Sequence, residues 1–263
     1  MDLGIAGKVA LVAGASKGLG RAVARGLALE GARVAMCARD GGALQETADA
    51  IAKETGAEVW CRPADLSDAA EARRFVQEAA AGFGTVHILV NNAGGPPSGS
   101  FMDFGDERWE AAFQLNLMSA IRLAREAIPF MRKQGWGRII NMTSVAVKQP
   151  LEGLILSNSV RAGLIGFAKT LSDEVAGDNI LVNNVCPGYT LTDRVRALAA
   201  ALAAKQGTTL EEVIRGWEST IPLGRLGTPE EFADLVVFLA SERASYITGA
   251  TIQIDGGYFR GLM

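Results

Sequence analysis

Short apolar runs alternate along the chain with longer segments in which apolar residues recur every three or four positions. The short runs indicate buried strands, and the longer segments indicate amphipathic helices. Predicted strands lie at 9–14, 33–38, 58–63, 87–94, 138–144, 180–185 and 250–255. Predicted helices lie at 18–30, 40–55, 68–82, 106–134, 156–177 and 229–241.

The predicted strands are apolar at nearly every position, so both of their faces are expected to be covered. Strands of this kind in regular alternation with helices indicate a parallel sheet between two helical layers. No Pro/Ser-rich linker or shift in composition divides the pattern. We therefore expect one α/β domain over 1–263, a Rossmann-type doubly wound parallel sheet of about seven strands with helices on both faces.

The least regular stretch, 188–226, follows the sixth predicted strand. Two helical fragments are predicted within it, at 193–205 and 210–218. Ligands of open parallel sheets bind beyond the carboxyl ends of the strands, and a long insert there is typical of a substrate loop or lid. Its apolar residues Leu198, Leu202 and Trp217 favour a substrate with an apolar portion, or else they close the protein's own core.

Composition narrows the classes of function. The chain has 263 residues, 49% of them hydrophobic, and a net charge of −3, so it can bury a sizeable core and has no basic footprint for nucleic acid. It has no apolar run long enough to span a membrane and no signal peptide pattern, so we expect a cytoplasmic protein. His87 is the only histidine, which excludes a His-rich zinc site. Cys37, Cys61 and Cys186 are scattered, as in a reduced protein without disulfides or metal.

A glycine-rich turn, AGASKGLG at 13–20, joins the first predicted strand to the first predicted helix. Gly14, Gly18 and Gly20 let the backbone turn tightly and approach a pyrophosphate, which a helix N-terminus favours. The spacing differs from the commoner Gly-x-Gly-x-x-Gly, but the strand before it and the helix after it support a dinucleotide site.

The same turn formally contains a nucleophile elbow around Ser16. A hydrolase of that kind needs a histidine late in the chain, after its acidic residue. His87 lies too early, so we set the hydrolase hypothesis aside.

The second predicted strand ends in Ala38-Arg39-Asp40. Arg39 together with Lys17 suits the 2′-phosphate of NADP(H), whereas an acidic residue at the tip would bind the free 2′-hydroxyl of NAD(H). If the strand ends one residue later, Asp40 is the acidic residue that would bind the ribose hydroxyl. Alternatively, Arg39 and Lys17 are ordinary solvated charges that bind no phosphate. We favour NADP(H) over NAD(H).

Six motifs occur in a fixed order along nearly the whole chain. They are AGASKGLG, NNAG (91–94), Asn116 in LNLMSA, INMTS ending at Ser144, PGYTLT (187–192) and TGATIQIDGG (248–257). Together they resemble the short-chain dehydrogenase/reductase family, and the tail 221–241 resembles its 3-oxoacyl-[acyl-carrier-protein] reductases. The resemblance implies an oxidoreductase acting on a small carbonyl or alcohol, and a homodimer or homotetramer formed through the helices around 106–134 and 157–177. It leaves the substrate open.

The resemblance also implies roles for individual residues. The adenosine phosphates would be held by Ser16, Lys17, Leu19 and Arg39, the adenine by Asp65 and Leu66, and the cofactor ribose by Asn92, Ala93 and Gly94. The nicotinamide carboxamide and pyrophosphate would contact Pro187, Gly188, Thr190 and Thr192. Ser144 would hydrogen-bond the substrate oxygen, and Asn116 would steady a water in the proton relay.

One departure from the family pattern concerns proton transfer. The family's Tyr-x-x-x-Lys pair follows the catalytic serine by thirteen positions, where this sequence has Ser157 and Arg161 in an otherwise preserved frame. A tyrosine pKa of about 10 can be drawn toward neutrality by nearby charge, but an aliphatic hydroxyl cannot be tuned in this way. Arginine stays protonated. Arg161 can still bind the nicotinamide ribose or polarise a carbonyl oxygen.

Three hypotheses follow. In the first, a working reductase takes its proton from Lys148, from Tyr189 or from water relayed through Ser157 and Asn116. In the second, the pocket performs a non-redox reaction in which Arg161 binds a carboxylate or an enolate. In the third, a nucleotide-binding protein has lost catalysis and acts in regulation or assembly. We favour the first because the serine and asparagine of the family's site are retained.

Overall fold

The computed structural model of the chain describes residues 2–262. Its strands form one parallel sheet in the order β3-β2-β1-β4-β5-β6-β7. The strands are β1 Val9–Ala13, β2 Arg33–Ala38, β3 Val59–Pro63, β4 Ile88–Asn91, β5 Gly137–Met142, β6 Ile180–Pro187 and β7 Thr251–Ile254. The strand order reverses between β1 and β4, and this switch point is where doubly wound sheets bind ligands. The predicted α/β fold is confirmed.

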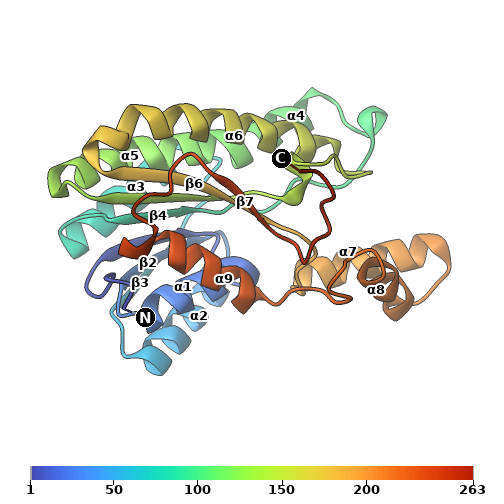
Figure 1. Cartoon of the computed structure of the whole chain (residues 1–263), viewed down its shortest axis with the longest axis horizontal. Helices are drawn as coiled ribbons and strands as arrows, with labels where there is room; N and C mark the ends of the chain where they lie inside the picture. The colour runs from blue at the N-terminus through green and yellow to red at the C-terminus, as the bar shows by residue number, and fades with distance from the viewer. Residues whose placement is uncertain (1, 263) are drawn as a thin grey trace.

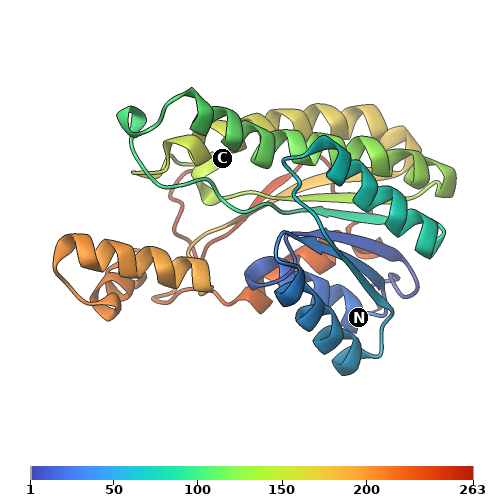
Figure 2. The same cartoon turned by 180° about the vertical axis from the view of Figure 1, so that it is seen from behind.

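Helices cover both faces of the sheet (Figures 1 and 2). They are α1 Gly18–Leu29, α2 Gly41–Thr55, α3 Ala69–Phe83, α4 Asp106–Phe113, α5 Ser119–Gln134, α6 Ile155–Val175, α7 Asp193–Gln206, α8 Leu210–Glu218 and α9 Pro229–Leu239. Apolar residues of α1, α2 and α9 pack into one core, and those of α3, α5 and α6 pack into the other. The boundaries follow local chemistry. Asp68 caps the start of α3, for example, and Gly84, with a φ of 83°, ends it.

The segment predicted as one helix over 106–134 is interrupted. A π-helical turn, Gln114–Met118, lies between α4 and α5. A π turn admits one extra residue and changes which side chains face inward. Here it buries Asn116, which is 4% exposed. The prediction was right about helix but missed this turn, because no glycine or proline marks it.

Helices α7 and α8 stand away from the sheet at one end of the molecule (Figures 1 and 2). They form the predicted insert and pack against each other around Ala199, Ala203 and Val213. Leu202 and Trp217 pack on this small core. For these two residues the structure therefore supports core packing over the alternative of a substrate-facing surface.

The three cysteines are free and lie at different depths. Cys37 and Cys186 are buried, and Cys61 is half-buried. Burial raises the pKa of Cys37 to about 12. Among residues 2–262 no group of three potential metal-ligating His, Cys, Asp or Glu side chains comes together. Within the same range no helix is both long and apolar enough to cross a bilayer.

Candidate active site

The glycine-rich turn forms as expected between β1 and α1. Gly14 and Gly18 have positive φ angles of 59° and 56°, which favour glycine. A Cβ atom on Gly20 would collide with the Gly14 carbonyl oxygen, so α1 can approach the turn only with glycine there. The Asn92 Nδ2 donates to the same carbonyl oxygen at 3.0 Å. No side chain among the described residues caps the first turn of α1, which leaves its N–H groups suited to a diphosphate.

The charged residues near the end of β2 have different surroundings in the structure. The Asp40 carboxylate accepts a hydrogen bond from the Ala43 N–H at 3.1 Å and caps α2. It is therefore engaged in starting a helix. Arg39 lies just beyond β2 and is exposed, as is Lys17 in the glycine-rich turn. This arrangement suits a phosphate group better than a ribose hydroxyl.

The other residues assigned to cofactor binding also follow the carboxyl ends of strands. Asp65 Oδ1 accepts from the Ser67 backbone N–H at 3.0 Å and from its hydroxyl at 2.8 Å, which fixes the turn after β3. Thr192 caps α7 by accepting from the Val195 N–H. The remaining members at this edge of the sheet are Ser16, Leu19, Leu66, Ala93, Gly94, Pro187, Gly188 and Thr190.

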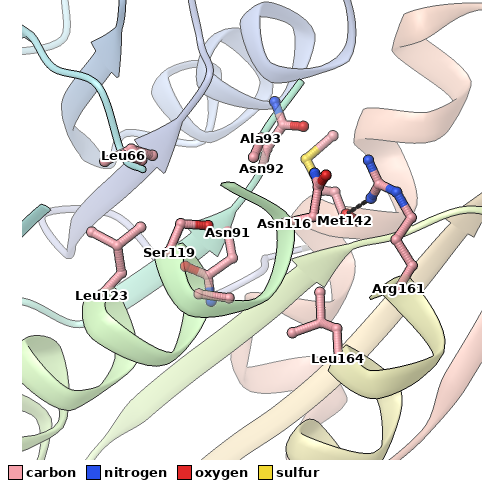
Figure 3. Close-up of a pocket in the computed structure, with 11 residues that line it drawn as sticks. Leu66, Asn91, Asn92, Ala93, Asn116, Ser119, Leu123, Met142, Arg161 and Leu164 are labelled. Atoms are coloured by element: carbon pink, nitrogen blue, oxygen red, sulfur yellow. Dashed lines mark hydrogen bonds between the residues drawn. The ribbon is translucent and has the colours of Figure 1, made fainter. Parts of the chain in front are cut away.

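The structure brings several of the predicted residues together in one pocket, which Figure 3 shows. Its lining includes Leu66, Asn91, Asn92, Ala93, Asn116 and Arg161. The Asn116 Nδ2 donates to the Gly94 carbonyl oxygen at 2.9 Å, while its Oδ1 has no hydrogen-bond partner within residues 2–262. Ser144 lies at the end of β5, where its hydroxyl accepts from the Ala146 N–H at 3.1 Å.

Ser157 and Arg161 lie on the same buried face of α6, as their spacing predicts. The Arg161 Nη1 donates to the carbonyl oxygens of Met142 at 3.0 Å and Thr143 at 3.1 Å. Figure 3 shows the guanidinium group reaching from α6 to the end of β5. Burial lowers the pKa of Arg161 to about 10, and repulsion from Arg194 acts in the same direction. At neutral pH the group remains a cation.

The two candidate side-chain proton donors differ in their surroundings. The Tyr189 ring stacks on Trp217, with centroids 4.7 Å apart, and meets the edge of Tyr258 at 5.4 Å. Burial raises the pKa of Tyr189 to about 12, with Tyr258 adding to the effect, so its hydroxyl is a weaker acid than an ordinary tyrosine. Lys148 follows the short 3₁₀ helix Val145–Val147 and is half-buried.

A row of buried asparagines crosses the sheet beside this pocket, and the sequence analysis missed it. The Asn91 Nδ2 donates to Asn141 Oδ1 at 2.8 Å, and the Asn141 Nδ2 donates to Asn184 Oδ1 at 2.9 Å. The Asn184 Nδ2 then donates to the Thr251 hydroxyl at 3.1 Å. These residues are register partners on β4, β5, β6 and β7. We call the row the asparagine ladder. The available signal was an asparagine near the end of three apolar strands.

Arg194 is a further residue that sequence reasoning missed. It lies in the first turn of α7, and its guanidinium donates to the carbonyl oxygens of Gly95 and Pro96, both at 3.2 Å. These bonds tie the insert to the loop after β4. Nothing in the sequence pattern of α7 separates Arg194 from Arg196 two positions later, and both residues are exposed.

The chain is similar to known proteins over nearly its whole length. Residues 14–259 match the family model described as Enoyl-(Acyl carrier protein) reductase. The chain is 36% identical over 259 residues to the 3-oxoacyl-[acyl-carrier-protein] reductase FabG of Aquifex aeolicus, covering 98% of this chain and 100% of the relative. It is 39% identical over 253 residues to the enzyme of the same name from Escherichia coli K12, covering 96% and 98%.

A solved structure agrees over the full length. The L-sorbose reductase of Gluconobacter frateurii, complexed with NADPH and L-sorbose, superposes with a TM-score of 0.96 at 38% identity and covers 100% of both chains. The agreement includes the whole sheet and both helical layers, since no part of either chain is left uncovered.

Proposed function

The chain belongs to the short-chain dehydrogenase/reductase family of oxidoreductases, and on this premise we propose that it transfers hydride between NADP(H) and a carbonyl or alcohol substrate at an atypical active site. In this site Ser157 and Arg161 occupy the positions of the family's tyrosine and lysine. The observation that carries the cofactor proposal is the pair of exposed cations, Lys17 and Arg39, beside an Asp40 that is engaged as a helix cap. NADPH in the sorbose reductase supports the same choice.

The residues present fit a dinucleotide. The glycine-rich turn and the uncapped N-terminus of α1 would hold the diphosphate, and the Asn92–Gly94 segment would line the ribose. The bound nicotinamide would supply or accept the hydride. The chain's own task is then to orient the carbonyl carbon and to handle one proton.

We propose that Ser144 and Arg161 orient and polarise the carbonyl oxygen, while the proton comes from water. The Ser157 hydroxyl is too weak an acid to replace a tyrosine, and Arg161 does not release its proton near neutral pH. The unpartnered Oδ1 of Asn116, in the pocket that Arg161 also lines, supports a water relay through Ser157 and Asn116. Tyr189 is disfavoured as the donor because its pKa is raised and its ring is packed between two aromatic side chains.

The retained serine, asparagine and nucleotide turn favour this redox proposal over the non-redox and regulatory alternatives. Each of these features serves hydride transfer in the family that the chain resembles. A protein used only for assembly has no need of this serine and this asparagine.

Cofactor titration tests the first part of the proposal. Binding of NADPH and of NADH is measured separately by nicotinamide fluorescence, and NADPH is expected to bind about tenfold or more tightly, because charge-assisted hydrogen bonds hold its extra phosphate. Lys17→Ala and Arg39→Ala should each weaken NADPH binding by about tenfold and leave NADH binding unchanged. Lys53→Ala, an exposed lysine on α2, is the matched control. Binding of neither nucleotide would refute the proposal.

A panel of ketones and aldehydes then tests the atypical site. The double variant Ser157→Tyr with Arg161→Lys restores the family's proton donor, so turnover of a reduced substrate should rise by about 10²–10⁴-fold. If the double variant binds NADPH normally but its turnover does not rise, then proton supply at these two positions does not limit turnover. Tyr189→Phe and Lys148→Ala should each keep the turnover of the unmodified protein, since we assign the proton to water. Loss of turnover in either variant would assign it to that side chain instead.

We further propose that the protein is a homodimer or homotetramer and is cytoplasmic. The outward face of α6 carries the small exposed residues Ser159, Ala162, Gly163 and Gly166, which allow close approach of another helix. The free cysteines suit a reducing compartment. Light scattering that gave a monomer mass would contradict the first statement, and recovery of the protein outside the cytosolic fraction would contradict the second.

A further inference from the structure

Arg161 is a buried cation whose described partners carry no charge. It is 8% exposed, and its Nη1 bonds to two backbone carbonyl oxygens. Within residues 2–262 it forms no ion pair, and its Nε and Nη2 have no hydrogen-bond partner. A buried charge without a counter-charge destabilises the folded protein. Such a group persists where function requires it.

Arg194 is a second cation, exposed on α7 and bonded to the loop that follows β4. Its guanidinium bonds only to the carbonyl oxygens of Gly95 and Pro96, and it too has no acidic partner in the part of the chain that the structure describes. The contact is close, because a Cβ on Gly95 would collide with this guanidinium. The neighbouring Gly94 carbonyl oxygen accepts from Asn116, which lines the pocket together with Arg161, so Arg194 lies beside the loop that borders this pocket. Repulsion from Arg194 also lowers the pKa of Arg161, second to burial.

Lys148 adds a third positive charge to this neighbourhood. Thr143 accepts from Arg161 through its carbonyl oxygen, its hydroxyl contacts the Cys186 sulfur atom, and Lys148 follows in the same loop. Burial raises the pKa of the Cys186 thiol, while Lys148 and Arg161 both act against that shift. Asp193 precedes Arg194 in the first turn of α7 but is exposed and makes no ion pair with it. Arg194 thus bonds to the loop after β4 and Arg161 to the end of β5, and neither forms an ion pair within residues 2–262.

We propose that Arg161 and Arg194 bind a carboxylate of the substrate, so that the carbonyl compound reduced by this protein is an oxo acid. Arg161 then contacts both the carbonyl oxygen and the carboxylate, through different N–H groups. This inference rests on the proposed function and specifies its substrate class. A planar carboxylate accepts paired hydrogen bonds from a guanidinium, and both arginines have donors to share. The anion also relieves the repulsion between the two cations.

Matched acid and ester probes test the inference. Binding of 2-oxopentanoate, 4-oxopentanoate and the methyl ester of each is measured by calorimetry on the full-length protein saturated with NADP⁺. The ester keeps the carbonyl group and removes the charge. At least one acid is expected to bind about tenfold or more tightly than its ester, because charged hydrogen bonds are worth at least that factor.

Two variants test the contact between Arg194 and Gly95, one at each residue. Arg194→Gln should abolish the preference for the acid and leave NADPH affinity unchanged. Gly95→Ala should have the same effect by displacing the guanidinium, and the fold should survive, since the collision involves only the end of a flexible side chain. Arg196→Gln removes an exposed charge from the same helix and should change neither affinity.

Three results would overturn the inference. The first is equal binding of acid and ester in both pairs, and the second is binding of none of the four probes. The third is an Arg194→Gln variant that loses NADPH affinity and keeps the acid preference, which would assign Arg194 to the cofactor's phosphates. In all three the unmodified protein still binds NADPH. If it does not, the proposed function fails as well, so the two failures are distinguishable.

Discussion

Gly20 and Gly82 both lie in helices, and their surroundings give the same substitution opposite effects. A Cβ on Gly20 would meet the backbone of Gly14 and the side chain of Asn92, whereas Gly82 is exposed with nothing within 4 Å. Gly20→Ala should therefore destabilise the protein by about 1–3 kcal/mol through overpacking. Gly82→Ala should stabilise it by about 0.5–1 kcal/mol, because alanine favours a helix. Chemical denaturation measures both, and a shared sign would contradict the prediction.

His87 should make the stability of the folded protein depend on pH in mildly acidic solution. The Val9 N–H donates to its Nδ1 at 3.0 Å, which requires that nitrogen to be unprotonated. Burial, with the nearby Lys8, lowers the pKa of His87 below 6.5. Between that lowered pKa and 6.5 the unfolded chain binds more protons, so stability should fall as the pH drops through this window. Thermal melts from pH 7.5 to 5 should show this loss. His87→Gln should flatten it, and because His87 is the only histidine, an unchanged slope would exclude this cause.

At the scale of single residues, the sequence predicted where side chains lie better than which other residues they contact. The shared face of Ser157 and Arg161 follows from their spacing alone and is confirmed. Asp40 was ambiguous because its role depends on where β2 ends, and only the hydrogen bond to Ala43 decides it. The sequence held no sign that Tyr189 would stack on Trp217, a residue 28 positions further on, counted as 217 − 189.

At the scale of secondary structure, the π turn between α4 and α5 determines where Asn116 points. Deleting Met118 should convert the π turn into regular α-helix. The helices α4 and α5 should keep about the same relative orientation, while the residues inside the turn, Asn116 among them, shift around the helix axis. The bond from Asn116 to the Gly94 carbonyl oxygen would then be lost. We expect a folded protein with at least tenfold lower turnover, a loss of about 1.4 kcal/mol in transition-state stabilisation. Full turnover in the deletion variant would show that the turn has no such role.

The strands and most helices were predictable because their signals are local. Buried parallel strands are apolar throughout, and helices such as α3 carry their own caps. The asparagine ladder and the contact of Arg194 with Gly95 join segments about 43 to 99 positions apart. Pairing at that distance depends on strand order and register, which a pattern of apolar residues does not contain.

At the scale of the whole molecule, α7 and α8 form the part that should open first. Their joint core is small, and local opening is easiest where few apolar side chains are buried. Lys205 and Lys133 are matched reporters, since each is exposed and lies two positions before a left-handed glycine that ends a helix. Limited trypsin digestion should cut after Lys205 well before Lys133. Equal rates, or earlier cleavage at Lys133, would mean that the insert is as stable as the sheet.

The asparagine ladder has a direction. Every amide in it donates toward β7, from Asn91 to Asn141 to Asn184 to Thr251. Reversing Asn141 alone would set its amide donor against that of Asn91 and its oxygen against that of Asn184, so this central member cannot turn by itself. The ladder is thus a polar row that begins with the unpartnered Oδ1 of Asn91, beside the pocket, and ends at the Thr251 hydroxyl on the edge strand. A molecule bound in that pocket meets an acceptor whose orientation is fixed from three strands away.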